Sequence, residues 1–229
     1  MISDPLRVFL DADVLAAPLT RTLLLVGAAR RGARFVPQWS LATEAEADRA
    51  LRPGQTLVSQ IRQQYDWGTG VLVPDATQEV MSALVDTSLG DRHVLAAATA
   101  VGITVVVTRN VHDFGHTDLH NAQACAVHPD MFMSHMATIT GYRDVLEAMA
   151  ESRQRPPNTA SALHAAIGAG HPRLFTAMRE AYPGVEPSVS PHAPPVELFR
   201  GAKCLLCDTL LNDPESLSLG LCPQCHREP

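Results

Sequence analysis

Three aspartates stand where an α/β fold would bring their carboxylates together. Asp11 follows the short apolar run of residues 7–10, and Asp113 follows the β-branched run of residues 103–107. Asp91 begins the helical segment that leads into the second run. Because the carboxyl ends of parallel strands open onto one crevice, we expect Asp11 and Asp113 to face the same cleft. Two alternatives stay open, since Asp91 can cap its helix and the other two can be solvated loop residues.

Acids gathered in this way favour metal chemistry. Carboxylates in one cleft repel one another, and burial raises the cost of keeping them ionised. A divalent cation removes that penalty, and carboxylate oxygens are ligands that Mg²⁺ and Mn²⁺ prefer. Two such ions, about 4 Å apart, can activate a water and stabilise the leaving oxygen of a phosphodiester. The pattern therefore predicts metal-assisted hydrolysis of a phosphate ester.

Four cysteines near the C-terminus form a second candidate metal site. Cys204 and Cys207 are separated by fourteen residues from the equally spaced pair Cys222 and Cys225. Four thiolates at this spacing complete the tetrahedral shell of a structural Zn²⁺, with His226 as an alternative ligand. Disulfides are the other interpretation, but the N-terminal residues lack a secretory pattern, so we expect a reducing, cytoplasmic setting. The segment resembles a zinc ribbon, a module that binds nucleic acid or a protein partner.

The hydrophobic pattern predicts α/β elements that could position these residues. Strands are expected near residues 7–10, 34–36, 103–107 and 124–127, and helices near 19–29, 41–51, 80–85, 94–98 and after Pro129. A helix through Ile61, followed by a turn at residues 68–70, is also expected. A helix closed by Gly102, then an apolar strand and a polar loop, is typical of a parallel unit covered on both faces.

The chain divides by composition into four segments. Residues 1–136 carry the acids and are expected to form one nuclease-like domain, and residues 137–182 are expected to form a helical extension interrupted at Pro156 and Pro157. Five prolines fall between Pro183 and Pro195, so residues 183–200 are predicted to be a semi-rigid linker. Residues 201–229 hold the cysteines.

Bulk composition limits the functional classes. Of 229 residues, 46% are apolar and 18% charged, which is typical of a globular chain. The formal charge of −6 argues against attraction of nucleic acid over the whole surface, although a local basic strip stays compatible with it. The single lysine is Lys203, so chemistry that needs a lysine in the first 200 residues is excluded. No apolar run is long enough to span a bilayer, and no membrane association is expected.

Four stretches resemble successive motifs of one nuclease family. FLDADVL, PQWSLATEAEADRAL, LGDRHVLAAATAVGITVVVTRNVHDF and HPDMF are similar, in this order from Val8 to Phe132, to the motifs of PIN domains. The similarity is strongest to the toxin ribonucleases of the VapC-like group. The helical segment around Pro156 and Gly170 resembles the C-terminal extension of one branch of that group. The resemblance implies a three-layer α/β/α domain with a central parallel sheet.

The resemblance also implies a role for individual residues. The four metal-binding, catalytic acids would be Asp11, Glu46, Asp91 and Asp113. Helical periodicity alone leaves Glu44, Glu46 and Asp48 equally open as the second acid. Thr108 and Asn110 match polar loop residues that support the site. Asp13 stands where relatives carry a small polar residue, and three roles stay open for it: binding metal, bonding the backbone or altering the charge of the site. Four arginines are candidates for contacts with an RNA backbone, or equally for surface ion pairs: Arg21, Arg49, Arg92 and Arg109.

The implied activity is that of a Mg²⁺- or Mn²⁺-dependent endoribonuclease, the toxin of a type II toxin–antitoxin pair. Its partners would be single-stranded or looped RNA, a small antitoxin protein and a second copy of the chain. A catalytically silent PIN fold that binds RNA or protein is the alternative. The Asp11-x-Asp13 pattern also resembles haloacid dehalogenases, but no lysine precedes residue 203 and Leu15 stands at the position of their threonine or valine.

Overall fold

The computed structural model describes residues 5–30, 33–64, 71–152, 159–189, 197–201 and 221–227, and residues 203, 204, 206, 207, 209, 211 and 216. The expected turn at 68–70, the break at Pro156 and Pro157 and residues 190–196 of the expected linker lie outside this part. The chain forms two compact units. One comprises residues 1–6, 17–36 and 129–195, and the other residues 7–16, 37–128 and 196–229. The four segments expected from composition stay a prediction.

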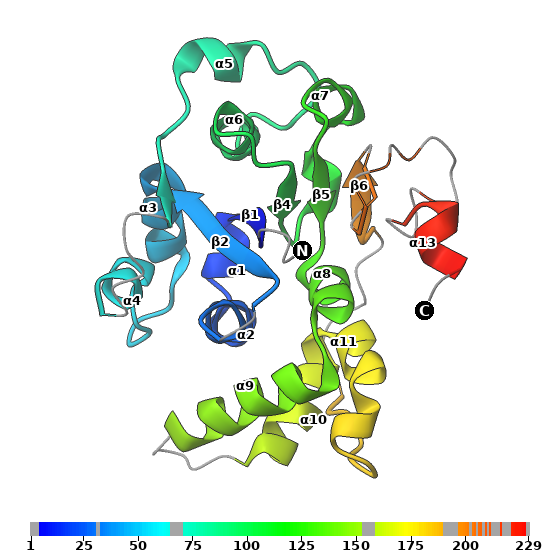
Figure 1. The fold of residues 1–229 in the computed structure, drawn as a ribbon. Coiled ribbons are helices and arrows are strands. Elements are labelled where there is room, and N and C mark those ends of the chain that lie inside the picture. The colour runs from blue at the N-terminus through cyan, green and yellow to red at the C-terminus, as the bar shows by residue number, and fades with distance from the viewer. Residues whose placement is uncertain are drawn as a thin grey trace. The chain divides into compact units, whose positions relative to one another are not determined.

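A six-stranded sheet forms the core of the second unit, in the order β3-β2-β1-β4-β5-β6 (Figure 1). The strands are β1 (Leu6–Leu10), β2 (Phe35–Ser40), β3 (Leu72–Val73), β4 (Val105–Val107), β5 (Cys125–Val127) and β6 (Phe199–Gly201). β1 runs parallel to β4, β4 to β5, and β2 to β3, whereas β6 is antiparallel to β5. The sheet is therefore mixed but mostly parallel, and the predicted α/β class is confirmed.

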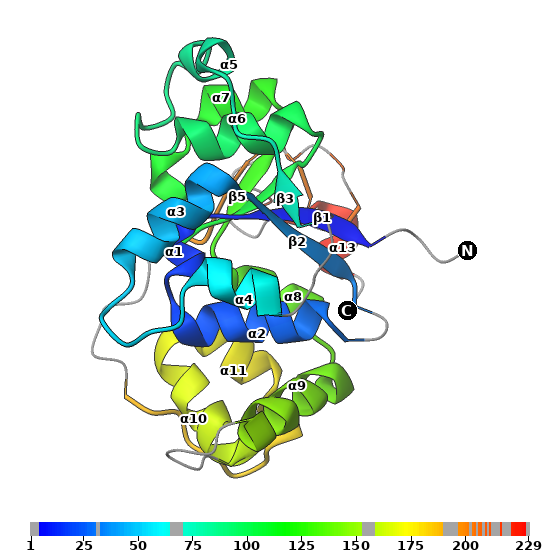
Figure 2. The same cartoon turned by 90° about the vertical axis from the view of Figure 1, so that its left-hand side faces the viewer.

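Helices flank this sheet. They are α1 (Ala12–Leu15), α3 (Leu41–Ala50), α4 (Val58–Gln64), α5 (Gln78–Ser82), α6 (Arg92–Ala100), the 3-10 turn η1 (Val111–Asp113) and α7 (His116–Asn121). Figure 2 shows α6 and α7 on one side of the sheet and α4 on the other. The central strands are apolar where both faces are covered: Val8 to Leu10 and Val105 to Val107 are all buried. These covered strands end at the edge where the predicted acids lie.

Strand β6 adds a C-terminal segment to the edge of the sheet. Its register places Gly201 beside Cys125, Arg200 beside Ala126 and Phe199 beside Val127. A side chain at Gly201 would collide with Cys125, so only glycine allows this close approach. The sequence pattern did not predict this strand. The short helix α13 (Pro223–Arg227) follows further along the chain.

Apart from the first residues of β1 and β2, the secondary structure described in the first unit is helical. It contains α2 (Pro18–Ala28), α8 (Pro129–Met136), α9 (Ile139–Ser152), α10 (Ala160–Gly170), α11 (Pro172–Ala177) and the 3-10 turn η2 (Arg179–Ala181). α9 packs on α2 and α10, and α11 packs on α8 and α10. The Tyr142 hydroxyl lies 2.8 Å from Nδ1 of the buried His164. Within the described part of the chain, none of the helices has the length and apolar character needed to cross a bilayer.

Candidate active site and cysteine cluster

Asp11 lies at the carboxyl end of β1, beside the end of β4. Its backbone amide donates to the Val107 carbonyl (3.0 Å), and its carboxylate accepts from the Ala12 amide (2.6 Å) as the N-cap of α1. The side chain is buried. Burial raises the pKa of Asp11 well above its ordinary value, and the nearby charges of Asp13 and Asp91 raise it further, against a hydrogen bond from Thr108. Asp11 is thus an acid that is costly to ionise.

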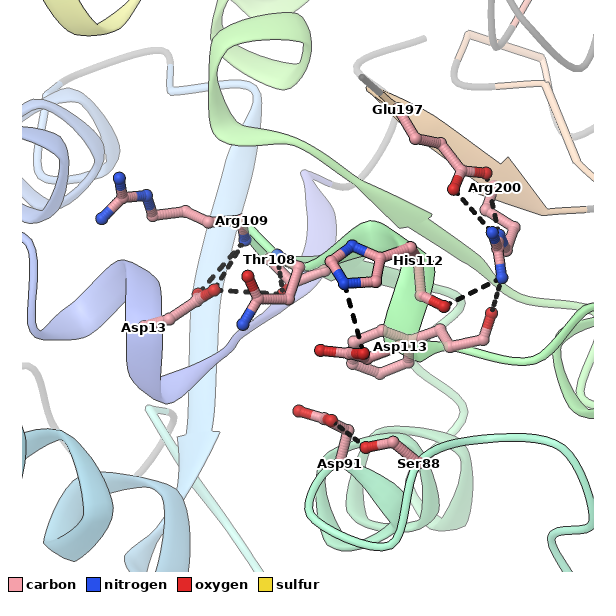
Figure 3. Close-up of polar contacts among 11 residues, drawn as sticks. Asp13, Ser88, Asp91, Thr108, Arg109, His112, Asp113, Glu197 and Arg200 are labelled. Atoms are coloured by element: carbon pink, nitrogen blue, oxygen red, sulfur yellow. Dashed lines mark hydrogen bonds and ion pairs between the residues drawn. The ribbon is translucent and has the colours of Figure 1, made fainter. Parts of the chain in front are cut away.

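Asp13 organises the loop that follows β4. Its carboxylate accepts from the Arg109 amide, at 3.2 Å to Oδ1 and 3.0 Å to Oδ2, and lies 3.5 Å from the Thr108 hydroxyl (Figure 3). The Thr108 hydroxyl in turn accepts from the Asn110 amide (3.1 Å). Burial raises the pKa of Asp13 to about 6, despite the opposing Arg109 contacts. Asp13 therefore binds backbone, which was one of its open roles.

Asp91 precedes α6 but its side chain does not cap that helix. Instead the Ser88 hydroxyl donates to Asp91 Oδ2. Burial raises the pKa of Asp91, and the charge of Asp113 raises it further, while the Ser88 bond and the neighbouring histidines His93 and His112 lower it. The carboxylate of Asp91 therefore makes no hydrogen bond that caps α6.

Asp113 ends η1 and faces Asp91 in Figure 3. Its side chain is about one-third exposed, at 32%, so solvent reaches it, and Oδ1 lies 3.4 Å from His112 Nε2. Its backbone carbonyl accepts from the Ser88 amide (2.8 Å). Ser88 thus links Asp113 to Asp91. Ser88 was not predicted from the sequence, because a serine three residues before an acid is common in ordinary loops.

The three acids of α3 have distinct surroundings. Glu44 is buried and accepts from Trp39 Nε1 (3.0 Å) and from two nitrogens of Arg62 (2.7 and 3.0 Å). Asp48 accepts from the Val58 amide (2.5 Å) and the Ser59 hydroxyl (2.7 Å). Glu46 is about half exposed and lies 3.3 Å from Nε2 of His93, two residues after Asp91. Of the three, Glu46 has the surroundings that would suit a site acid.

The arrangement of the acids fits a cation, although it is not a closed shell. Among the described residues, the four cysteines are the one group of three or more potential ligands whose atoms all lie within 4.8 Å of one another. Asp11, Asp91 and Asp113 are further apart than that, yet near enough for Asp91 to raise the pKa of Asp11, and for Asp113 to raise that of Asp91. Repelling oxygen donors of this kind are stabilised by a hard divalent cation.

The cysteine cluster has the geometry of a thiolate site. Cys204, Cys207, Cys222 and Cys225 form no disulfide, and the sulfurs of Cys207 and Cys222 are 3.5 Å apart. Sulfurs around a tetrahedral Zn²⁺ with bonds of about 2.3 Å would be about 3.8 Å apart. Backbone amides of Leu206 and Cys225 point at sulfurs, at 3.5 and 3.4 Å. Hydrogen bonds from Thr209 lower the pKa of Cys207 to about 6, towards the thiolate form that binds metal.

The candidate arginines do not form one strip. Arg21 is buried, the Arg49 side chain donates to Ala45 in its own helix, and that of Arg92 donates to the Thr87 carbonyl. Figure 3 shows the Arg109 side chain extending away from the carboxylate of Asp13. Arg109 differs from the other three in that its backbone amide donates to the carboxylate of Asp13.

Comparison with known proteins found a partial match. The chain is 32% identical over 99 residues to "Putative ribonuclease VapC50" of Mycobacterium tuberculosis (strain ATCC 25618 / H37Rv). The match covers 42% of this chain and 59% of that relative. No protein-family profile matches the chain, and no solved structure matches it. The chain is therefore similar, over part of its length, to a protein named as a VapC ribonuclease.

Proposed function

We propose that the chain is a divalent-metal-dependent endoribonuclease of the VapC type, with Asp11, Glu46, Asp91 and Asp113 as its site acids. The observation that carries this proposal is the position of Asp11 at the carboxyl end of β1, near Asp91, which in turn lies near Asp113, so that Asp91 raises the pKa of Asp11 and Asp113 that of Asp91. A structural role alone does not explain why three carboxylates, one of them buried, lie this near to one another. The similarity to a named ribonuclease supports RNA as the substrate class.

The chain's own residues would bind and orient the reacting groups. Asp11, Asp91 and Asp113 would hold Mg²⁺ or Mn²⁺, with Glu46 acting directly or through water. When bound, the metal supplies Lewis-acid activation of water and stabilisation of the leaving oxygen. Asp13 fixes the loop after β4 through the Arg109 amide, and Ser88 fixes Asp91 relative to the Asp113 backbone. Water adds to phosphorus and the bond to the 3′ oxygen breaks, which leaves a 3′ hydroxyl and a 5′ phosphate.

The test compares wild type with Asp11→Asn and Asp91→Asn in cleavage of single-stranded RNA with added Mg²⁺ or Mn²⁺. Glu79→Gln is the matched control, because Glu79 is an exposed acid on α5 and is not one of the proposed site acids. We expect both site variants to lose at least about a hundredfold in rate and the control to keep wild-type activity. Equal cleavage by all four proteins would reveal a contaminating nuclease and overturn the proposal.

A silent, RNA- or protein-binding fold is the second candidate. It is favoured by the spacing of the acids, since no three of the described carboxylates gather within 4.8 Å. If varied RNAs are not cleaved and titration with Mn²⁺ shows no binding, this second candidate replaces the first. Binding of Mn²⁺ that is lost in Asp11→Asn would favour the nuclease even before a substrate is known.

Partners and the zinc site complete the proposal. We infer a small antitoxin protein and a second copy of the chain as partners, on the resemblance to toxin ribonucleases. The cysteine cluster would hold one structural Zn²⁺, because four thiolates leave no open position for substrate. Co-expression with a neighbouring small reading frame, followed by copurification, would test the antitoxin.

A further inference from the structure

Arg200 reaches from the C-terminal strand to the loop that carries Asp113. Its Nη1 donates to the carbonyls of His112 and Phe114, both at 3.0 Å, across 88 and 86 residues of sequence. Its Nε and Nη2 donate to the two carboxylate oxygens of Glu197, at 2.8 and 2.6 Å. Figure 3 shows this fork between Glu197 on one side and the loop on the other. One side chain therefore holds the backbone carbonyls of the two residues that flank the fourth acid, His112 and Phe114.

The loop is held at three consecutive carbonyls. Arg200 binds those of residues 112 and 114, and the Ser88 amide binds that of Asp113 (2.8 Å). Bonds from a guanidinium are charge-assisted, and the Glu197 pair fixes the plane of the guanidinium, so the direction of its remaining hydrogens is set. With these three carbonyls fixed, the carboxylate of Asp113 keeps its orientation towards Asp91.

Strand β6 places Arg200 there. Ala126 on β5 pairs with Arg200, and the Leu198 carbonyl accepts from the His128 amide (2.8 Å). Only two residues separate Gly201 from Cys204, the first residue of the cysteine cluster. The same short segment therefore serves both the sheet edge and the cluster.

We propose that Arg200 is a positioning residue for Asp113, so that the C-terminal segment is part of the nuclease site and not only an appended module. This inference rests on the proposed metal-dependent function. It assigns a role to Arg200, which in the sequence is only one of a few basic residues near the cysteines. Partners that orient a metal ligand typically contribute about 10- to 100-fold to metal affinity or activity.

The experiment measures Mn²⁺ binding without RNA, by electron paramagnetic resonance, in wild type, Arg200→Ala, Arg200→Lys and the control Arg52→Ala. Arg52 is an exposed arginine whose side chain is not in the site. We expect Arg200→Ala to weaken Mn²⁺ binding at least about tenfold and Arg52→Ala to leave it unchanged. Arg200→Lys should recover part of the loss, because an ammonium can still donate to both carbonyls but cannot pair with Glu197 by two bonds.

Hydrogen exchange at residues 111–114 provides the second measurement. Faster exchange together with weaker Mn²⁺ binding in Arg200→Ala supports the proposal. Wild-type exchange or wild-type Mn²⁺ binding in that variant overturns it. If Arg200→Ala does not fold, Glu197→Gln should show a smaller shift of the same sign, and no shift overturns the proposal. Failure of the proposed function differs visibly, since wild type itself would then bind no Mn²⁺.

Discussion

The pKa of Asp13, near 6 against an ordinary 3.8, makes the stability of the metal-free chain depend on pH. Between about pH 4 and 6 Asp13 binds its proton more tightly in the folded chain than in the unfolded chain, so its contribution to the free energy of unfolding falls as pH rises. Asp13→Asn should remove part of this loss, because an amide oxygen can still accept from Arg109. We expect a gain of about 1–3 kcal/mol at pH 7 without added divalent metal.

Urea unfolding at pH 4.5 and pH 7 measures this effect. Between pH 4.5 and pH 7, the change in the free energy of unfolding should be less favourable in wild type than in Asp13→Asn, and added Mn²⁺ should shrink this difference. Asp11 and His128 remain in both proteins and contribute with opposite signs, since burial raises the pKa of Asp11 and lowers that of His128 to about 4. An unchanged slope in Asp13→Asn would show that its carboxylate is already ionised and well solvated in the folded chain.

Two acids of α3 are expected to have different roles: Glu46 serves the site, and Glu44 stabilises the fold. Glu46→Gln should lower RNA cleavage at least about tenfold and leave stability within about 0.5 kcal/mol, because Glu46 is about half exposed. Glu44→Gln should instead cost about 2–4 kcal/mol, since it leaves Arg62 without its carboxylate partner. Cleavage assays and urea unfolding on both variants decide between them. Loss of cleavage only in Glu44→Gln, at full stability, would reverse the assignment.

At the residue scale, a single sequence predicts only part of the site. Asp11 and Asp113 follow strands and Asp91 precedes a helix; the structure brings their charges near one another, and their role as site acids stays a prediction. The selection of Glu46 needed a resemblance, because neighbouring helical acids differ only in direction. Arg200 and Ser88 match no motif, because each bonds a carboxylate three residues away, as surface residues commonly do, and their contacts with the loop of Asp113 join segments that are distant in sequence.

At the element scale, the loop before α6 is joined to α7 by reciprocal hydrogen bonds, in which the carboxylates of Asp118 and Asp86 each accept from backbone amides of the other segment. Buried Asp118 accepts from the amides of Val85, Asp86 and Thr87 at 2.8 to 3.1 Å, and Asp86 accepts from those of Thr117 and Asp118. These bonds fix the backbone immediately before Ser88. The carboxylate of Asp91 is therefore positioned by a loop whose own order depends on a residue of α7.

Asp118→Ala should accordingly reduce both stability and activity. Three amides would lose their acceptor, at a cost of about 2–4 kcal/mol. With RNA saturating, cleavage should fall more at limiting metal than at saturating metal, because displacement of Ser88 disturbs the orientation of Asp91. Thermal unfolding and metal titrations of cleavage, with Glu79→Gln as the control, measure both effects. Full activity in a folded Asp118→Ala protein would show that the loop does not position Asp91.

Elements with a distinct apolar or helical pattern were predicted well. The predicted strands at 7–10 and 124–127 correspond to β1 and β5, and the helix at 41–51 to α3. β3 has only two residues, and β6 reads Phe-Arg-Gly with no apolar run, so neither strand was predicted. The strand expected at 34–36 extends to Ser40 instead, because Pro37 and Gln38 interrupt its apolar pattern without ending the strand.

At the scale of the whole molecule, the net charge of −6 and the acid cluster both disfavour the binding of RNA by the metal-free chain. Both repel phosphate, so RNA binding by the metal-free chain should be weak. Divalent metal would reverse the local sign at the site while leaving the rest of the surface acidic. The affinity for RNA should therefore depend more on the divalent cation than on the monovalent salt that governs basic nucleic-acid-binding proteins.

The cysteine cluster provides the last prediction, since it tests whether the C-terminal segment is joined to the function of the whole chain. Native mass spectrometry should find one zinc per chain in wild type and in Cys125→Ser, because Cys125 is a buried residue of β5 outside the cluster. Cys204→Ser and Cys222→Ser should lose zinc. Since Arg200 lies four residues before Cys204, loss of zinc should also speed hydrogen exchange at residues 111–114. Zinc loss that leaves exchange at this loop unchanged would show that β6 folds without the cluster, and that the metal serves another purpose.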